Sequence, residues 1–373
     1  MTTAPTRHTL LPLTALLAGV LAASSGAHAA AAAKPAHHAK AKAARAHLTD
    51  YVGEDVNFSQ WKAVDQFVAA MVATHGFERA ELDAQIKKLR LVDAAIELVK
   101  PAPPGKPKNW HAYSALFIEP VRIDAGLKFW NTHAQALARA EAEYGVPAEI
   151  IVGILGVETV YGRNTGRFRV MDALATLAFA YPETPNQAER MAFFRAELES
   201  TLLLARKYQL DPYSLQGSFA GAVGLPQFMP SSILQYGVDF DGDGQVDLRA
   251  SPVDAIGSVA NYLVQHGWRR EQAGPIVYPA TVSPGRAWAG MIGKPLAANE
   301  DQASLLAAGV TTEAALPPGL RFGLIDLQNG AQATEFWLAT DNFFAITQYN
   351  RSYFYAMSVV ELGRAVRLAR ART

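Results

Sequence analysis

The sequence predicts a mainly α-helical protein with one small β-containing excursion. Apolar residues recur at helical spacing over most of the segment from residue 61 to residue 266, and again from residue 353 to residue 370. Between about residues 269 and 340, prolines, glycines and short apolar runs replace that spacing. The chain has 373 residues, of which 50% are hydrophobic, so it is long enough to bury a sizeable core.

The first helices are predicted from apolar faces that end at helix-stop signals. The spacing predicts a helix from Trp61 to Gly76, a second around residues 82–89, and a crossing through the proline-rich residues 100–107. Asp124 is predicted to cap a helix that continues to Tyr144. The next helix begins after a short turn, with Pro147 in its first turn, where a missing N–H does no harm.

The later elements follow the same signals. Glycine and proline residues separate the helical faces, and short β-branched or aromatic runs within the excursion predict strands. The predicted helices span residues 170–181, 190–204, 252–266 and 353–370, and the predicted strands include residues 275–278, 324–327 and 335–338.

The first residues have the pattern of an export signal. Arg7 and His8 precede an apolar run from Leu10 to Ala23, and residues 27–29 form a small-x-small cleavage site. We therefore expect residues 1–29 to be a cleaved signal peptide, residues 30–48 an Ala/Lys/His-rich linker, and residues 49–373 the folded region. No later run is long enough to cross a bilayer, which predicts a soluble, exported, periplasmic protein without a membrane anchor.

Charge and cysteine content exclude several classes of function. Lys+Arg 34 and Asp+Glu 34 give a net charge of zero, so no electrostatic argument favours a nucleic-acid partner. Because the sequence contains no cysteine, it has no disulfide, no thiol nucleophile and no lipid-modified N-terminal cysteine.

Glu158 stands within an almost entirely apolar stretch, residues 149–163. Its apolar neighbours are spaced to press a helix into a core, where a carboxyl group loses water and its pKa rises. A glutamate that keeps its proton near neutral pH can serve as a general acid. The alternative is a partly exposed glutamate paired with Arg163 or Arg167.

The segment Gln216–Ser232 is rich in glycine and proline but too apolar for a solvated loop. Glycine lets the backbone come close to a ligand, which makes Ser218 and Gln227 candidate binding residues. A tightly packed turn that satisfies both side chains internally is the alternative.

The acidic loop from Asp239 to Asp247 has the spacing of an EF-hand loop. Asp239, Asp241, Asp243 and Asp247 occupy positions one, three, five and nine, Gly244 occupies position six, and Gln245 offers its main-chain oxygen at position seven. Position twelve, which usually carries a glutamate, is Ala250, and Asp254 at the start of the next helix is the candidate replacement. We expect a structural Ca²⁺ site here; the alternative is a solvated Asp/Gly turn.

Several motifs together resemble the B-type family of lytic murein transglycosylases. They are GVETVYGRNTG, GSFAGAVGLPQFMPSS, PVDAIGSVANYLVQHGW and ITQYNRS, and the resemblance runs from about Asp50 to Arg370. It implies a lysozyme-like catalytic core with an additional α subdomain and a small β-containing subdomain. The family cleaves the MurNAc–GlcNAc β-1,4 bond of peptidoglycan glycan strands without hydrolysis and leaves 1,6-anhydro-MurNAc ends.

The resemblance also implies roles for individual residues. Glu158 matches the single catalytic acid/base, and a calcium site at the acidic loop is in keeping with the family. Where the family often has a groove tyrosine, this chain has Phe193, so that substrate hydrogen bond does not carry over. The residues that match groove positions are Ser218, Gln227, Tyr113, Tyr262, Tyr349 and Asn350, and one or two of the three tyrosines are expected to be mainly structural.

Two rival functions remain open at the level of sequence. A muramidase of the same fold would use water and would need a second carboxylate, for which Asp172 is the nearest candidate. We interpret Asp172 instead as a helix-start residue. The second rival is a wall-binding or scaffold protein that has lost turnover.

Overall fold

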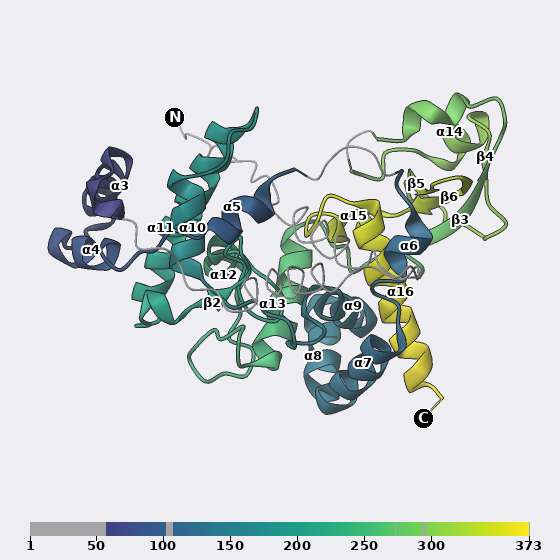
Figure 1. Ribbon diagram of the computed structural model, residues 1–373. Coiled ribbons are helices and arrows are strands. Elements are labelled where there is room, and N and C mark those ends of the chain that lie inside the picture. Colours follow the sequence, from purple (N-terminus) through teal and green to yellow (C-terminus); the bar gives the residue numbers. More distant parts are fainter. Residues whose placement is uncertain (1–56, 102–106, 273, 294–295, 373) are drawn as a thin grey trace, which may run out of the picture.

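The apolar stretch around Glu158 forms helix α9 (Ala148–Thr159), which lies among other helices in the computed structural model (Figure 1). The structure describes residues 57–101, 107–272, 274–293 and 296–372. Helix α9 contacts α7 (Pro120–Thr132), α8 (Ala134–Tyr144), α13 (Pro252–Gln265) and α16 (Tyr353–Arg370). The predicted core residues Ile150, Ile151, Ile154, Leu155 and Val157 are all buried. The fold is therefore mainly α-helical, as predicted.

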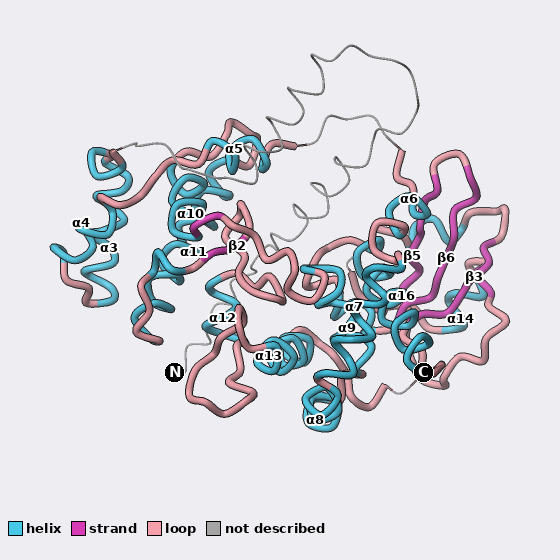
Figure 2. Tube along the Cα trace, turned by 60° about the horizontal axis from the view of Figure 1, so that its bottom comes forward, coloured by secondary structure: helices cyan, strands magenta, loops and turns pink. Residues whose placement is uncertain are grey.

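A second group of helices extends the molecule to one side. Figures 1 and 2 place α3 and α4 at one end and the larger β-sheet at the other. This group also contains two 3₁₀ helices. Its elements are η2 (Phe58–Gln60), α3 (Lys62–His75), α4 (Arg79–Ile86), α5 (Asp93–Val99), α10 (Val170–Phe179), α11 (Gln187–Lys207), η3 (Pro212–Ser214) and α12 (Pro230–Tyr236).

The larger sheet lies within the segment where short strands are predicted. Its four antiparallel strands have the order β4–β3–β6–β5, and its own small core includes Tyr278, Trp288 and Phe322. The elements of this region are β3 (Val277–Val282), η4 (Ala287–Met291), α14 (Gln302–Ala307), β4 (Val310–Thr311), β5 (Gly323–Asn329) and β6 (Gln332–Ala339). Helices α6 (Trp110–Ser114) and α15 (Asp341–Ile346) lie between the sheet and the helical core (Figure 1).

A two-stranded pairing not predicted from the sequence connects the helical groups. Strand β1 (Phe168–Arg169) pairs antiparallel with β2 (Gln216–Gly217). Gly166 approaches this pair so closely that a Cβ atom there would overlap the backbone of Gly217. The start of the glycine-rich segment is thereby fixed next to the chain that leaves α9.

Three boundary predictions are wrong. Asp124 lies inside α7, which begins at Pro120 and is capped by Glu119, whose carboxylate accepts the N–H groups of Val121 and Arg122. The predicted helix from there to Tyr144 is also two helices, because the backbone leaves helical geometry at His133. Pro147 is the N-cap residue of α9 rather than part of its first turn.

Two glycines allow the backbones of α9 and α16 to pack closely against each other. A Cβ atom on Gly153 would overlap the carbonyl oxygen of Val359, and one on Gly363 would overlap the carbonyl oxygen of Glu149. Neither glycine has a left-handed backbone, so it is the closeness of the other helix that requires glycine here. The two helices are thus in direct backbone contact on both sides of the crossing.

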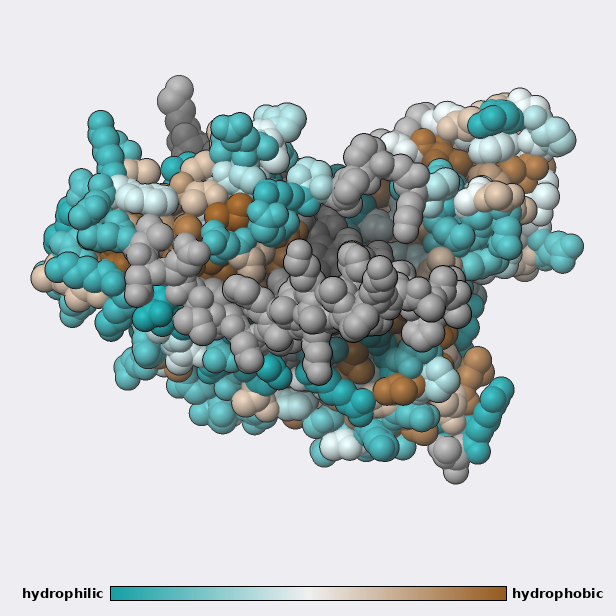
Figure 3. Space-filling view, viewed as in Figure 1, coloured by the Kyte–Doolittle hydropathy of each residue, from teal (hydrophilic) through white to brown (hydrophobic). Residues whose placement is uncertain are grey.

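Polar residues cover most of the described surface on the face that Figure 3 shows. Among the described residues, Val121, Leu306 and Leu368 are the large hydrophobic side chains that are exposed. Within the same residues, no helix combines the length and apolarity needed to cross a bilayer. The predicted signal peptide and linker, residues 1–48, and most of the predicted proline-rich crossing, residues 102–106, lie outside the described residues.

Candidate active site

Glu158 lies in the last turn of α9, partly buried, with Tyr355 as its hydrogen-bond partner. The Tyr355 hydroxyl donates to Glu158 Oε1 at 2.5 Å. Burial raises the pKa of Glu158 from 4.5 to about 7, and the hydrogen bond from Tyr355 acts in the opposite direction. Arg163 and Arg167 are exposed, and neither forms an ion pair with Glu158. The carboxyl group is therefore suited to holding a proton near neutral pH.

The chain turns sharply directly after Glu158. Val160 and Tyr161 both have left-handed backbones, with φ of 52° and 58°. The Thr159 hydroxyl donates to the carbonyl oxygen of Leu225 at 2.8 Å and accepts the N–H of Gly162 at 2.9 Å. The end of α9 is thus tied to the glycine-rich segment that carries Ser218 and Gln227.

Four tyrosines lie near the carboxyl group of Glu158. Burial raises the pKa of each phenol, and the negative charge of Glu158 raises it further. They are Tyr113 on α6, Tyr262 on α13, Tyr349 just before α16, and Tyr355 in the first turn of α16. Four phenol groups thus lie within electrostatic range of one carboxyl group, and that of Tyr355 is in direct contact with it.

The hydroxyl groups separate these tyrosines into two kinds. Tyr262 donates to the carbonyl oxygen of Gln348 at 2.9 Å, and Tyr349 donates to that of Pro226 at 3.1 Å. Both are buried, and their hydroxyls are engaged within the fold. The hydroxyl of the half-buried Tyr113, by contrast, has no hydrogen-bond partner among the described residues. Two of the three predicted groove tyrosines therefore contribute to packing.

Tyr355 was not predicted from the sequence as a site residue. Its position in a terminal helix with an apolar face made it resemble a core residue, and it is indeed buried. The available signal was the aromatic run Tyr353-Phe354-Tyr355 directly after the QYN motif. Only the packing of α16 on α9 places its hydroxyl on Glu158.

Ser218 and Gln227 are both buried within the glycine-rich segment. Ser218 Oγ accepts the N–H groups of Ala220 and Ala222 at 3.3 and 3.0 Å. Gln227 has a left-handed backbone, and its amide nitrogen donates to the carbonyl oxygens of Thr165 and Gly224 at 3.1 and 2.8 Å. These bonds leave the Ser218 hydroxyl proton and the Gln227 Oε1 oxygen for other contacts. Asn350, the remaining predicted groove residue, is buried, and it follows Tyr349 in the sequence.

Asp172, the candidate second carboxylate, is fully buried and engaged elsewhere. It lies in the first turn of α10, where the guanidinium of Arg169 donates to its Oδ2 at 2.6 Å and the N–H of Arg90 donates to its Oδ1 at 3.1 Å. The interpretation as a helix-start residue agrees with this position. Its partners connect α10 to the chain before α5.

The acidic loop brings together Asp239, Asp241 and Asp254, whose carboxylate oxygens lie within 4.8 Å of one another. Asp254 is buried in the first turn of α13 and accepts the N–H groups of Phe240 and Asp247 at 2.8 and 2.9 Å. Asp243, predicted as a ligand, lies outside this cluster, and its Oδ1 accepts the N–H of Gln245. Three hard oxygen donors and a loop of EF-hand spacing are a donor set that fits Ca²⁺.

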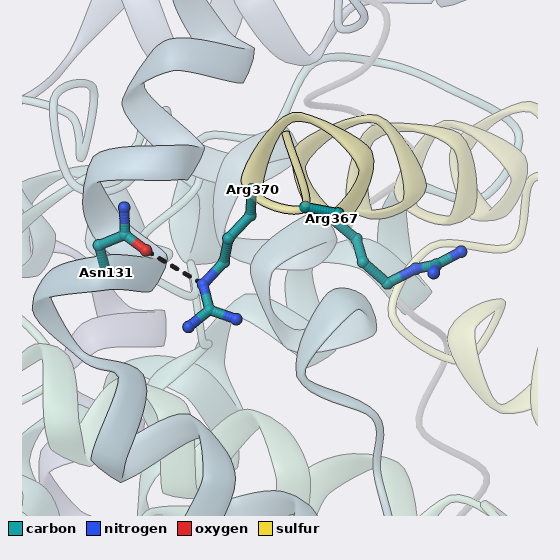
Figure 4. Close-up of a pocket in the computed structure, with 4 residues that line it drawn as sticks. Asn131, Arg367 and Arg370 are labelled. Atoms are coloured by element: carbon teal, nitrogen blue, oxygen red, sulfur yellow. Dashed lines mark hydrogen bonds between the residues drawn. The ribbon is translucent and has the colours of Figure 1, made fainter. Parts of the chain in front are cut away.

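A surface pocket lies between the ends of α7 and α16, lined by Asn131, Arg367, Arg370 and Ala371 (Figure 4). Arg370 Nε donates to Asn131 Oδ1 at 3.0 Å, and Arg367 pairs with Glu149 at the opposite end of α9 from Glu158. This pocket offers no acid for bond cleavage and is distinct from the site around Glu158.

The comparisons with known proteins agree on one family. The family described as "Transglycosylase SLT domain" matches residues 57–364. Membrane-bound lytic murein transglycosylase B of Escherichia coli (strain K12) is 43% identical over 324 residues, which cover 85% of this chain and 86% of that protein.

Two solved structures share the fold along nearly their whole length. Catenated lytic transglycosylase SltB1 of Pseudomonas aeruginosa is 43% identical, with a TM-score of 0.76 and coverage of 84% of this chain and 99% of that one. Lytic transglycosylase Slt35 of Escherichia coli, solved in complex with calcium, is 41% identical, with a TM-score of 0.74 and coverage of 86% and 97%.

These likenesses define the chain as an enzyme of lysozyme-like fold that cleaves peptidoglycan. More narrowly, the chain belongs to the B-type lytic murein transglycosylases. The predicted fold class and the predicted activity are both confirmed.

Proposed function

We propose that Glu158 is the single acid/base with which this transglycosylase cleaves the MurNAc–GlcNAc bond. One observation carries the proposal: burial at the end of α9 raises the pKa of this carboxyl group to about 7. At neutral pH a large share of the molecules therefore holds a proton there, ready for a leaving oxygen.

The reaction needs two proton transfers at Glu158. In the first step the protonated carboxyl group gives its proton to the bridging oxygen, the bond from that oxygen to C1 of MurNAc breaks, and GlcNAc leaves as an alcohol. In the second step the C6 hydroxyl of the same MurNAc attacks C1, and the Glu158 carboxylate takes the hydroxyl proton. The products are a free GlcNAc 4-hydroxyl and a 1,6-anhydro-MurNAc end, and the enzyme regains its proton.

One carboxylate is sufficient because the nucleophile belongs to the substrate. Most glycosidases need a second carboxylate to attack the sugar or to activate water. Intramolecular attack by the C6 hydroxyl has a high effective concentration once the ring is distorted into reach. The burial of Asp172 with Arg169 speaks against the muramidase alternative, since that carboxylate already has structural partners.

The groove residues are assigned by the hydrogen-bond donors and acceptors that each side chain does not use within the fold. Tyr113 offers a hydroxyl without a partner among the described residues, Ser218 its hydroxyl proton, and Gln227 its Oε1 oxygen. Tyr262 and Tyr349 support the wall of the groove, and Asn350 lies next to Tyr349 in the chain. The proposed ligand is a peptidoglycan glycan strand. SltB3 of Pseudomonas aeruginosa, 29% identical with a TM-score of 0.68, was solved with NAG-anhNAM-pentapeptide.

Mass spectrometry of the sugars released from purified peptidoglycan tests this function. We expect muropeptides that end in 1,6-anhydro-MurNAc, which are one water lighter than hydrolysed ends. Reducing MurNAc ends would instead identify a muramidase. If folded protein binds the wall but releases nothing, the scaffold alternative is correct.

We also propose that the acidic loop holds a structural Ca²⁺ ion through Asp239, Asp241 and Asp254. Gln245 and Asp243 are predicted as further ligands: Gln245 through its main-chain oxygen at position seven, and Asp243 through its carboxylate at position five. When bound, the ion would connect the loop to the first turn of α13, which also carries Tyr262. Its role would be to stabilise the fold, with no part in the chemistry at Glu158.

Adding calcium after chelation should raise the melting temperature. A ligand that binds only the folded state stabilises it by about 2.7 kcal/mol at a hundred times its Kd, which for a domain of this size corresponds to roughly 5 °C. Differential scanning calorimetry with and without Ca²⁺ measures the shift. Asp241→Asn should lose it, whereas Asp124→Asn, at an exposed position on α7 away from the loop, should keep it. A parent protein that melts identically in both conditions contradicts the site.

Finally, we propose that the protein is exported to the periplasm, where its substrate lies. The support is the signal-like pattern of residues 1–29 and the small-x-small site at residues 27–29. N-terminal sequencing of the protein recovered from its native host should find a start at Ala30.

A further inference from the structure

The hairpin formed by β5 and β6 contacts α6, the short helix that carries Tyr113. The N–H of Gly330 at the hairpin turn donates to the carbonyl oxygen of Lys108 at 2.8 Å. Asn109 and Asn329 form an isolated antiparallel bridge. The hairpin and the start of α6 are therefore joined by backbone contacts, although more than two hundred residues separate them in the sequence.

Helix α6 depends on these contacts for its position. With five residues it is far shorter than a helix that is stable by itself. Its first N–H groups need acceptors from outside the helix. Asn109 Oδ1 accepts the N–H of Ala112 at 2.9 Å, and Asn329 Oδ1, from the hairpin, accepts the N–H of His111 at 2.9 Å. One of the two caps thus comes from the sheet.

Asn329 is buried, and the contacts around it are directed at the same helix. Its amide nitrogen donates to the carbonyl oxygen of Ala333 at 3.3 Å, which orients the side chain within its own hairpin. On the exposed side, His111 Nε2 lies 2.9 Å from Glu335 Oε1 and His111 Nδ1 lies 3.2 Å from Gln332 Oε1. Figure 1 shows α6 between the sheet and α16.

Tyr113, on α6, lies within electrostatic range of Glu158: burial raises the pKa of its phenol, and the charge of Glu158 raises it further. Its ring lies 5.5 Å from that of Phe354, the neighbour of Tyr355, and 5.1 Å from that of Phe117. The ring therefore packs on α16 through Phe354, and the backbone of α6, which carries the ring, sets its place along α16. The backbone of α6 is in turn held by the hairpin.

We infer that the β5–β6 hairpin sets the position of Tyr113 in the substrate groove, and that Asn329 is the positioning residue through which it does so. The small sheet then has a defined task in cleavage, although none of its residues needs to touch the sugar. The inference rests on the proposed function, since it takes Glu158 as the acid and Tyr113 as a groove residue.

A double-mutant cycle with Asn329→Ala and Tyr113→Phe tests the inference. A hydrogen bond to the transition state that is lost corresponds to a rate change of about fivefold to tenfold. We expect Tyr113→Phe to lower kcat/KM for peptidoglycan about tenfold and Asn329→Ala about fivefold. If Asn329 acts through Tyr113, the double variant should be no slower than Tyr113→Phe alone. Losses that multiply, or a folded Asn329→Ala protein with the parental rate, would overturn the inference.

The pH profile gives a readout that a merely structural role would not change. A displaced Tyr113 lets water reach Glu158, so the fall of cleavage on the basic side should move to lower pH in Asn329→Ala. The matched control is Gln328→Ala, at the exposed neighbouring position, whose amide donates to Asp326 on the same strand. It should keep the parental rate and profile.

Folding and the identity of the acid are controlled separately. If Asn329→Ala does not fold, His111→Ala replaces it in the cycle, because it removes two exposed contacts between the same hairpin and α6. That variant should show a smaller loss that again disappears in the Tyr113→Phe background, and an independent loss overturns the inference. Glu158→Gln distinguishes a failure of the proposed function from a failure of the positioning role. If Glu158→Gln is inactive but the losses in the cycle multiply, only the positioning role of Asn329 is refuted. If Glu158→Gln is active, the proposed function itself is refuted.

Discussion

Replacing Glu158 with glutamine should lower cleavage about a thousandfold while the protein stays folded. A positioned general acid contributes on the order of 10²–10⁴ to a rate, and here the same group serves in both proton transfers. Glutamine keeps the shape of the side chain and an acceptor for the Tyr355 hydroxyl, but it has no proton to give. Release of anhydro-muropeptides from purified peptidoglycan, with circular dichroism to check folding, measures the effect.

The pH dependence of the same variant provides a second, independent result. The folded-state pKa of Glu158 is raised from 4.5 to about 7, so between these values the folded protein binds more protons than the unfolded chain. Its contribution to stability therefore falls as the pH rises through this window. Because Glu158→Gln lacks this penalty, it should melt at a higher temperature than the parent above pH 7. In the parent, cleavage should fall with an apparent pKa of about 7.

Two control variants locate the acid. Tyr355→Phe removes the hydrogen bond that lowers the pKa of Glu158, so the basic fall of activity should move to higher pH. Asp172→Asn disturbs a buried carboxylate paired with Arg169, so it should lose stability but keep the parental products. A Glu158→Gln protein that retains most of its cleavage would show that another group is the acid.

Replacing Gly153 with alanine should destabilise the protein by about 2 kcal/mol and reduce cleavage as well. The added methyl group overlaps the carbonyl oxygen of Val359, so α9 and α16 must separate, and forced overpacking of this kind typically costs about 1–3 kcal/mol. The gain in helix propensity from glycine to alanine, up to about 1 kcal/mol, offsets only part of this. Since α9 carries Glu158 and α16 carries Tyr355, the separation also weakens the contact between them.

Thermal unfolding followed by circular dichroism measures the change in stability. Gly290→Ala is the matched control, because that glycine has an ordinary backbone and a Cβ atom there meets nothing within 4 Å. Gly363→Ala, at the other side of the same crossing, should repeat the effect of Gly153→Ala. If Gly153→Ala melts like Gly290→Ala, the helices are not in backbone contact at this point.

The sequence was sufficient where local chemistry decides the structure. The predicted limits of the last helix, residues 353–370, match α16, because Ser352 accepts the N–H of Tyr355 and the apolar face continues to the end. The apolar surroundings of Glu158 were also predictable, since nearly every residue around it is apolar in the sequence and is buried in the fold. The spacing of the acidic loop pointed to Asp239, Asp241 and Asp243, of which the first two lie together with Asp254, the candidate replacement from the next helix.

The features that could not be predicted from the sequence depend mostly on contacts between segments that are distant in the chain. The break between α7 and α8 at His133 has no glycine or proline to mark it. The hydrogen bond from Tyr355 to Glu158 joins residues 197 positions apart, so no periodicity along the chain could reveal it. The pairing of β1 with β2 involves only two residues on each strand, too few for a strand signal.

The turn directly behind Glu158 has a consequence for attempts to make the enzyme more heat-resistant. Val160 and Tyr161 have left-handed backbones, which cost roughly 1–2 kcal/mol each in residues other than glycine. The rest of the fold must offset this free-energy cost. Glycine at position 160 would relieve part of it, and a screen for thermostability would select that change readily. The same exchange would loosen the chain where Thr159 is bonded to Leu225. Selection for stability alone would thus favour a less rigidly held Glu158. The strained backbone at this turn is therefore better kept.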